Sequence, residues 1–164
     1  MKKSILFTLT LLSYAISGYA QEDIDKDYAS FVKSFTRQIY YPTELVKVRK
    51  PLFCLVKIET DTEKNVKSIS VSDSADSTFV AQFNGRKHQV SFEPLSSFLK
   101  KKYALTDATS FFIPLSFSLS DFPQGNQTLP IDILNKYYKF GGVGLLGNTV
   151  FLDAITIRET VPKG

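Results

Sequence analysis

Alternating apolar and polar positions in two neighbouring stretches predict a β-hairpin. The first stretch, Leu52–Thr60, is rich in β-branched residues and places apolar side chains at every second position, with Cys54 on the apolar face. The second stretch, Val66–Val71, alternates in the same way. The polar residues Asp61–Asn65 lie between the two and are typical of a turn. We therefore expect two antiparallel strands joined by this turn.

Two later stretches also predict strands, each with one irregular position. Ser110–Leu119 carries apolar residues at strict period two. Pro114 lies inside this stretch and has no amide to donate, so we expect the strand to lie at a sheet edge or to be bulged there. Thr149–Ile157 is a last apolar stretch, and its alternation breaks at Asp153-Ala154, where we expect a bulge.

Helical spacing of apolar residues predicts four helices. The first, Tyr28–Ile39, follows a loose polar start at Gln21–Asp27 and ends before Tyr41-Pro42, because a residue that precedes proline avoids the helical region. Helices mixed with these strands indicate an α+β fold, with an antiparallel sheet of three or four strands and helices packed on one face. The other helices are Ser77 to Asn84-Gly85, Glu93–Lys102 with Pro94 in its first turn, and Pro130–Phe140.

Residues 1–20 are typical of a secretory signal peptide. Lys2 and Lys3 precede a short apolar run, and a small residue, Ala20, stands at the expected cleavage point. The run is shorter than the roughly 20 residues that cross a bilayer comfortably. We expect cleavage after Ala20, a periplasmic or secreted protein, no stable membrane insertion after cleavage, and one mature domain over residues 21–164.

Charge and cysteine content narrow the class of protein. The chain has 20 basic and 16 acidic residues, and removal of Lys2 and Lys3 leaves a net charge of about +2. This balance is far from the strongly basic composition of a nucleic-acid-binding domain, so we expect no nucleic-acid partner. The single cysteine, Cys54, cannot form an internal disulfide, and its place in an alternating strand predicts burial.

The residues that would carry catalysis or bind a metal are sparse in this sequence. The single histidine, His88, lies in a polar segment, and no serine stands in a G-x-S-x-G setting, which disfavours a Ser-His-Asp hydrolase. One histidine and one distant cysteine do not make a zinc or copper site. The segment Gly141-Gly142-Val143-Gly144 follows a helix and precedes a strand, the reverse of a phosphate loop, and is interpreted as a turn. We expect no enzymatic activity, no cofactor and no metal.

Several short motifs follow one another in a recognisable order. They are Tyr41-Pro42, Phe53–Glu59, Asp61–Asn65, Val66–Val71 followed by Ser72-Asp73-Ser74, and Ile113–Leu119. This order resembles the C-terminal domain family of TonB-like energy transducers, whose members carry Tyr-Pro after a helix, then a strand, an acidic turn, a second strand, a helix and a final strand. The resemblance covers residues 31–119 and leaves residues 120–164 as a helix–strand extension.

The resemblance implies helices on one face of a three-stranded antiparallel sheet. It also implies binding by strand addition, in which an edge strand pairs with a partner's peptide. The chain departs from the family at Pro51 and Asn65, where glycine is usual, and we expect it to lack the uncleaved membrane helix and the proline-rich spacer of energy transducers. We therefore expect no transmission of force from an inner-membrane motor.

The first functional hypothesis is an exported, non-enzymatic interaction module that binds an envelope protein or peptide at an exposed sheet edge. Either Phe111–Leu119 or Thr149–Ile157 would supply that edge. Pro114 would equally serve to protect an edge from aggregation. The candidate partner-binding residues are Phe111, Ile113, Leu115, Phe117, Ile155 and Ile157.

The alternative hypothesis is a small-ligand protein of the cell envelope. It would bind a lipid or a glycan in an apolar cleft between the sheet and the C-terminal helix. The candidate groove residues are the tyrosines Tyr40, Tyr41, Tyr137 and Tyr138. A hydrolase that uses His88 and scattered acids is the third and weakest hypothesis.

Overall fold

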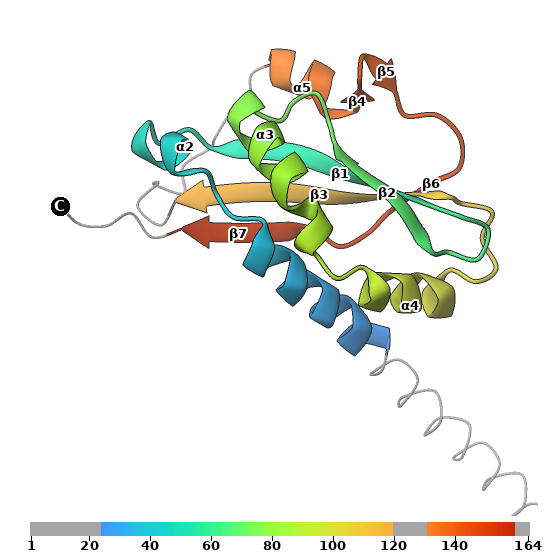
Figure 1. Ribbon diagram of the computed structural model, residues 1–164. Helices are drawn as coiled ribbons and strands as arrows, with labels where there is room; N and C mark the ends of the chain where they lie inside the picture. Colours follow the sequence, from blue (N-terminus) through green and yellow to red (C-terminus); the bar gives the residue numbers. More distant parts are fainter. Residues whose placement is uncertain (1–23, 120–130, 160–164) are drawn as a thin grey trace, which may run out of the picture.

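A mixed β-sheet with helices packed against it forms the fold, which is α+β as predicted (Figure 1). The computed structural model describes residues 24–119 and 131–159. The strands lie in the order β2-β1-β3-β6, and β7 also pairs with β3. These strands are β1 (Leu52–Thr60), β2 (Val66–Val71), β3 (Ser110–Leu119), β6 (Thr149–Phe151) and β7 (Ile155–Glu159).

Helices and one small hairpin complete the described part of the chain. The predicted bounds of β1, β2 and β3 are confirmed, as are those of one helix, Glu93–Lys102. The signal peptide predicted at residues 1–20 lies outside the described residues. The elements are a helix over residues 24–38, α2 (Thr43–Lys47), α3 (Ser77–Arg86), the 3₁₀ turn η1 (Lys87–Gln89), α4 (Glu93–Lys102), α5 (Ile131–Tyr137), β4 (Lys139–Phe140) and β5 (Val143–Gly144).

The sheet is mixed, whereas the sequence led us to expect an antiparallel one. β1 pairs antiparallel with β2 and with β3, but β6 and β7 run parallel to β3. A parallel partner needs a long crossover, and the segment between β3 and β6, which includes α5 and the β4–β5 hairpin, provides it. Alternation of side chains predicts that a stretch is a strand but carries no information on its direction.

The proline inside β3 lies opposite a break in the neighbouring strand. Leu55 of β1 donates to Ser72 Oγ (2.9 Å) and accepts from the Ser72 amide (2.9 Å), so its backbone faces β2 rather than β3. Pro114, which is the partner of Leu55, therefore turns its ring nitrogen toward β6 and β7. There the residues Leu152–Ala154 separate β6 from β7, so no residue of these two strands pairs with Pro114 on that side of β3. The predicted irregularities at Pro114 and at Asp153-Ala154 are thus one feature.

One face of the sheet is covered by the N-terminal helix, α3 and α4, and we call it the helix-covered face. Phe31, Phe35 and Ile39 of the N-terminal segment are fully buried in this core. Phe79 of α3 packs edge-on against Phe117 of β3, with ring centroids 5.2 Å apart. Aromatic rings thus supply much of the apolar area that stabilises this side.

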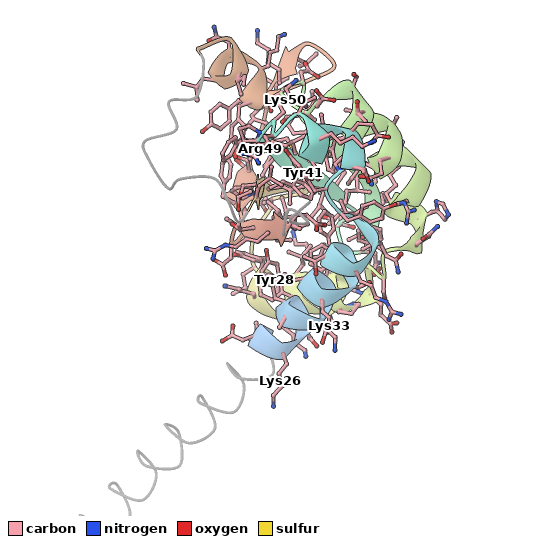
Figure 2. The ribbon with its side chains drawn as sticks, turned by 90° about the vertical axis from the view of Figure 1, so that its left-hand side faces the viewer. Lys26, Tyr28, Lys33, Tyr41, Arg49 and Lys50 are labelled. Atoms are coloured by element: carbon pink, nitrogen blue, oxygen red, sulfur yellow. The ribbon has the colours of Figure 1, made fainter. Side chains whose placement is uncertain are left out.

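The N-terminal helix is longer than predicted, because its first turn is tied to α4. We expected Gln21–Asp27 to be a loose start, but residues 24–27 are helical. Asp27 forms an ion pair with Lys101 (2.7 Å) and accepts from the Ser97 hydroxyl (2.7 Å). Tyr28 turns toward the sheet and donates to the carbonyl of Asp153 (2.6 Å) (Figure 2). Contacts distant in sequence therefore extend this helix.

Helix α3 continues through the residues that we expected to end it. Asn84-Gly85 lies inside α3, which ends at Arg86 and passes into η1. The N-cap is Asp76, whose carboxylate accepts from the Thr78 amide (2.9 Å). A glycine lowers helix propensity by about 1 kcal/mol, which tertiary packing of Phe83 outweighs here.

The turn between β1 and β2 is built from side-chain hydrogen bonds. Asp61 accepts from the Asn65 amide (2.9 Å), and this bond together with the Asn65 side chain holds the pKa of the Asp61 carboxyl below its ordinary value. Lys64 adopts a left-handed φ of 63° and is buried. Its ammonium donates to the carbonyls of Thr106 and Ala108, at 2.7 Å each, and so joins the hairpin to the segment before β3.

Candidate functional site

The strand β3 is central in the sheet, so the edge predicted at Phe111–Leu119 does not exist. β1 pairs along one side of β3, and β6 and β7 pair along the other. The prediction was wrong because the chain's own C-terminal strands occupy that edge. β6 and β7 are the outer strands on this side of the sheet, and they lie within or overlap the alternative edge predicted at Thr149–Ile157. Of the predicted partner-binding residues, Ile157 is half-buried, and the buried ones are Phe111, Ile113, Leu115, Phe117 and Ile155.

The four tyrosines predicted to line a groove lie in different surroundings. Tyr41 is buried in the core against Phe117, with ring centroids 5.3 Å apart, so it does not line an open groove. Tyr40 is half-buried beneath the guanidinium of Arg86, which lies 4.4 Å from its ring. Tyr137, the last residue of α5, contacts Tyr138 in the turn that follows, and among the described residues no ring contact joins them to the first pair.

The opposite edge of the sheet is β2, which the sequence reasoning did not consider. Among residues 24–119 and 131–159, no strand pairs with the outer side of β2. Since Leu55 and Ser72 bond to each other across β1 and β2, the alternation of an antiparallel ladder turns the backbone groups of Ile69 and Val71 outward. The carbonyl of Ile69 confirms this direction, because the ammonium of Lys87 donates to it from outside the sheet (3.2 Å).

A groove of about 310 Å³ runs beside this edge. The strand Val66–Ile69 forms one wall, and η1 together with Phe92 forms the other. Phe92 and Ile69 make the groove partly apolar, while the lining contains two lysines and a histidine but no carboxylate. A free strand edge next to a groove with apolar and basic walls is suited to hold an extended peptide. The groove-lining residues are Val66, Lys67, Ser68, Ile69, Lys87, His88 and Phe92.

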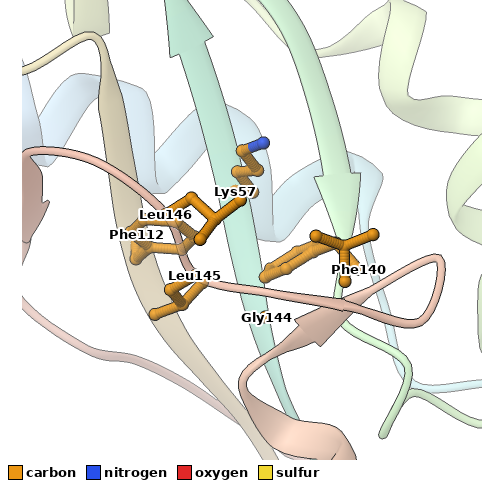
Figure 3. A pocket seen from close by; sticks show the side chains of 7 residues that line it. Lys57, Phe112, Phe140, Gly144, Leu145 and Leu146 are labelled. Atoms are coloured by element: carbon orange, nitrogen blue, oxygen red, sulfur yellow. The ribbon is translucent and has the colours of Figure 1, made fainter.

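A second hollow, of about 120 Å³, lies on the other face of the sheet, where the β4–β5 hairpin covers β1 and β3 (Figure 3). We call this side the hairpin-covered face. Phe112 contacts Phe140 and Phe151, with centroid distances of 5.7 and 5.6 Å. Large apolar side chains near the hollow stay exposed, namely Val143 (56%), Leu146 (78%) and Phe151 (49%). The lining residues are Lys57, Phe112, Phe140, Val143, Gly144, Leu145 and Leu146.

Of the glycine segment predicted to be a turn, Gly141-Gly142 joins β4 to β5 and is held by one carboxylate, whereas Val143-Gly144 forms the strand β5. Gly141 and Gly142 have φ of 59° and 81°, a conformation that side chains disfavour. Both glycine amides donate to the carboxylate of Asp73 (2.7 Å each), and the Asp73 amide donates to the carbonyl of Lys139 (2.8 Å). Asp73 therefore fastens the hairpin to the segment after β2.

The single cysteine and the single histidine lie in different surroundings. Cys54 is fully buried, and burial raises the pKa of its thiol, which keeps it protonated and unreactive. His88 is exposed on η1. Within the described ranges no group of three or more His, Cys, Asp or Glu residues is arranged to hold a metal ion.

Two further observations bear on the class of the protein. In the part of the chain that the structure describes, no helix has the length and apolar character needed to cross a bilayer. No protein-family model, no curated protein and no solved structure matches this chain. The resemblance to TonB-like C-terminal domains therefore stays a prediction from the order of motifs.

Proposed function

We propose that this protein is an exported, non-enzymatic interaction module that binds an extended peptide by strand addition at β2. The observation that carries the proposal is the outer side of β2, with which no strand of the described residues pairs, beside the 310 Å³ groove. An incoming strand would bond to the outward groups of Ile69 and Val71 and place alternate side chains in the groove. Residues 31–119 resemble a family that binds by strand addition, which supports the same mechanism here. The proposed edge is β2 rather than Phe111–Leu119 or Thr149–Ile157, which the sequence had suggested.

Among the strands at the two edges of the sheet, β2 is favoured over β7. Both have one side free of other strands among the described residues. The groove that includes both strand and helical residues lies beside β2. In the break between β6 and β7, the carbonyl of Asp153 already accepts a hydrogen bond from the Tyr28 hydroxyl. Backbone pairing supplies affinity in this mode, and specificity requires a wall that contacts side chains.

The test is selection of a display library of random seven-residue peptides on the protein, followed by a variant that lacks one outward amide. In Val71→Pro the bond donor is lost on the free side of β2, while the ladder to β1 is kept. Selected peptides are expected to bind this variant at least tenfold more weakly. Val71→Thr, which keeps the amide and the β-branch, is the control and should bind within about twofold of the wild type.

A second measurement keeps the test decisive if Val71→Pro fails to fold. A selected peptide added to the ¹⁵N-labelled wild-type protein should shift the amide resonances of Ile69 and Val71 more than those of β3 or β7. Peptides that bind without moving the β2 resonances, or a library that yields no binder, would overturn strand addition at this edge.

A second candidate function is the binding of a small apolar ligand at the hairpin-covered face. The observation that favours it is the 120 Å³ hollow with Val143, Leu146 and Phe151 exposed around it. It lies between the sheet and the β4–β5 hairpin rather than against the C-terminal helix, where we expected a cleft. A thermal-shift screen with lipids and glycans tests it: a rise in melting temperature that Leu146→Asp abolishes would support a ligand there.

A further inference from the structure

We propose that the β2 groove selects peptides that carry a carboxylate, and that Lys87 is the residue that reads it. The inference rests on the proposed strand addition and specifies the chemistry of the partner.

The Lys87 ammonium at present occupies a position that an added strand would need. It donates to the outward carbonyl of Ile69 at 3.2 Å and lies 5.9 Å from the ring centroid of Phe83. An incoming strand donates its own amide to the same carbonyl, since that is the acceptor exposed on the edge. Binding therefore releases the ammonium from its hydrogen bond and leaves it beside the groove, free to pair with a group of the peptide.

A carboxylate on the peptide would supply that partner. The groove lining carries Lys67, Lys87 and His88 and has no acidic residue of its own. Among the described residues no carboxylate lies within ion-pair distance of Lys87. A glutamate or aspartate that enters the groove beside the displaced lysine pairs with it, whereas a neutral side chain leaves it unpaired and a basic one repels it.

The plainer explanation is that these lysines only protect an edge strand from aggregation. Charged side chains on a sheet edge commonly have that role. Protection predicts that removal of Lys87 increases self-association and changes no peptide preference. Selection of acidic peptides predicts a change in which sequences bind, so the two explanations are separated by one experiment.

The experiment uses the random seven-residue library on the wild type, on Lys87→Gln and on Lys47→Gln. Lys47 is exposed on α2 and serves as the matched control for loss of one positive charge. Wild-type selections are expected to enrich Asp or Glu at one position at least threefold over the library. Lys87→Gln should remove the enrichment and weaken a selected acidic peptide about fivefold at low salt, the size of one exposed ion pair. Lys47→Gln should leave both unchanged.

The remaining outcomes distinguish this inference from the function on which it rests. Peptides that bind Val71→Pro more weakly than the wild type but show no acidic enrichment would overturn the selection of carboxylates and leave strand addition intact. Acidic enrichment that survives in Lys87→Gln would have the same consequence. Acidic peptides that bind Val71→Pro as well as the wild type would show attraction to general positive charge and overturn the proposed site. A library without any edge-dependent binder overturns both. In 0.5 M salt the fivefold difference is expected to shrink, because surface charge pairs are screened.

Discussion

The two faces of the sheet are packed by different means. The helix-covered face is sealed by three helices, and its aromatic residues, such as Phe79 and Phe117, are fully inaccessible to solvent. The hairpin-covered face is covered by two short strands, and Phe151 and Leu146 there remain exposed. The first face therefore supplies most of the buried apolar area, whereas large exposed apolar side chains lie on the second face.

The largest difference between the faces is expected from removal of one phenyl ring on each. Phe117→Ala leaves a cavity between Tyr41 and Phe79 and should lower the free energy of unfolding by about 3–5 kcal/mol. Phe151→Ala removes a half-exposed ring and should cost less than about 1 kcal/mol. Urea denaturation followed by circular dichroism measures both. Equal losses would contradict the division of roles between the faces.

The next largest effect is expected at Lys64, the buried lysine in the turn between β1 and β2. Lys64→Met keeps the aliphatic stem but leaves the carbonyls of Thr106 and Ala108 without their donor, and should cost about 2–3 kcal/mol. Lys67→Met, three residues further along, changes an exposed side chain and should stay within about 0.5 kcal/mol. Thermal unfolding of the two variants compares them directly. A loss below about 1 kcal/mol in Lys64→Met would mean that water replaces the ammonium.

A smaller and more local effect is expected at the hairpin cover. Asp73→Ala removes the acceptor of the Gly141 and Gly142 amides and should cost about 1–2 kcal/mol. The hairpin should loosen before the rest of the fold, so hydrogen exchange at these two amides should accelerate more than exchange in β1. Asp73→Asn, which keeps one side-chain oxygen acceptor, should fall between. Unchanged exchange at both glycines would show that the hairpin is held by its apolar contacts alone.

The smallest expected effect is a gain in stability when Tyr41 is replaced by phenylalanine. Its hydroxyl is buried with no hydrogen-bond partner, so Tyr41→Phe should be stabilising by up to about 1 kcal/mol at pH 7. Burial, reinforced by the charge of Asp76, raises the pKa of Tyr41 to about 12. A raised pKa stabilises the fold below the unfolded value near 10, and this contribution is lost as the pH rises from 10 toward 12.

Tyr41→Phe should therefore flatten the fall in stability between pH 10 and 12. Tyr137→Phe provides the comparison on the C-terminal side, because burial raises the pKa of Tyr137 to about 12 as well. Urea titrations at pH 9, 10, 11 and 12 measure the effect. A fall that is identical in the wild type and in Tyr41→Phe would place the alkaline transition elsewhere in the molecule.

Local patterns carried much of the fold but little of the candidate site. The alternation in Leu52–Thr60 and Val66–Val71, and the helical spacing in Glu93–Lys102, predicted these elements with their bounds. The β2 edge was missed because a strand lies at an edge only when no other strand pairs with its outer side. Local alternation of side chains does not show which strands pair. One available signal was the exposed polar pair Lys67-Ser68 on a strand much shorter than its neighbour.

The sequence by itself determined the bounds of β1, β2, β3 and α4, because side-chain periodicity and the conformational limits of proline act over a few residues. Tertiary structure alone decided that β6 and β7 run parallel to β3 and cover its edge, and that Pro114 meets the break between them. It also decided that Lys87 of η1 reaches Ile69 of β2. These arrangements depend on contacts between segments distant in the chain, which compete on total buried area and hydrogen bonding rather than on local preference.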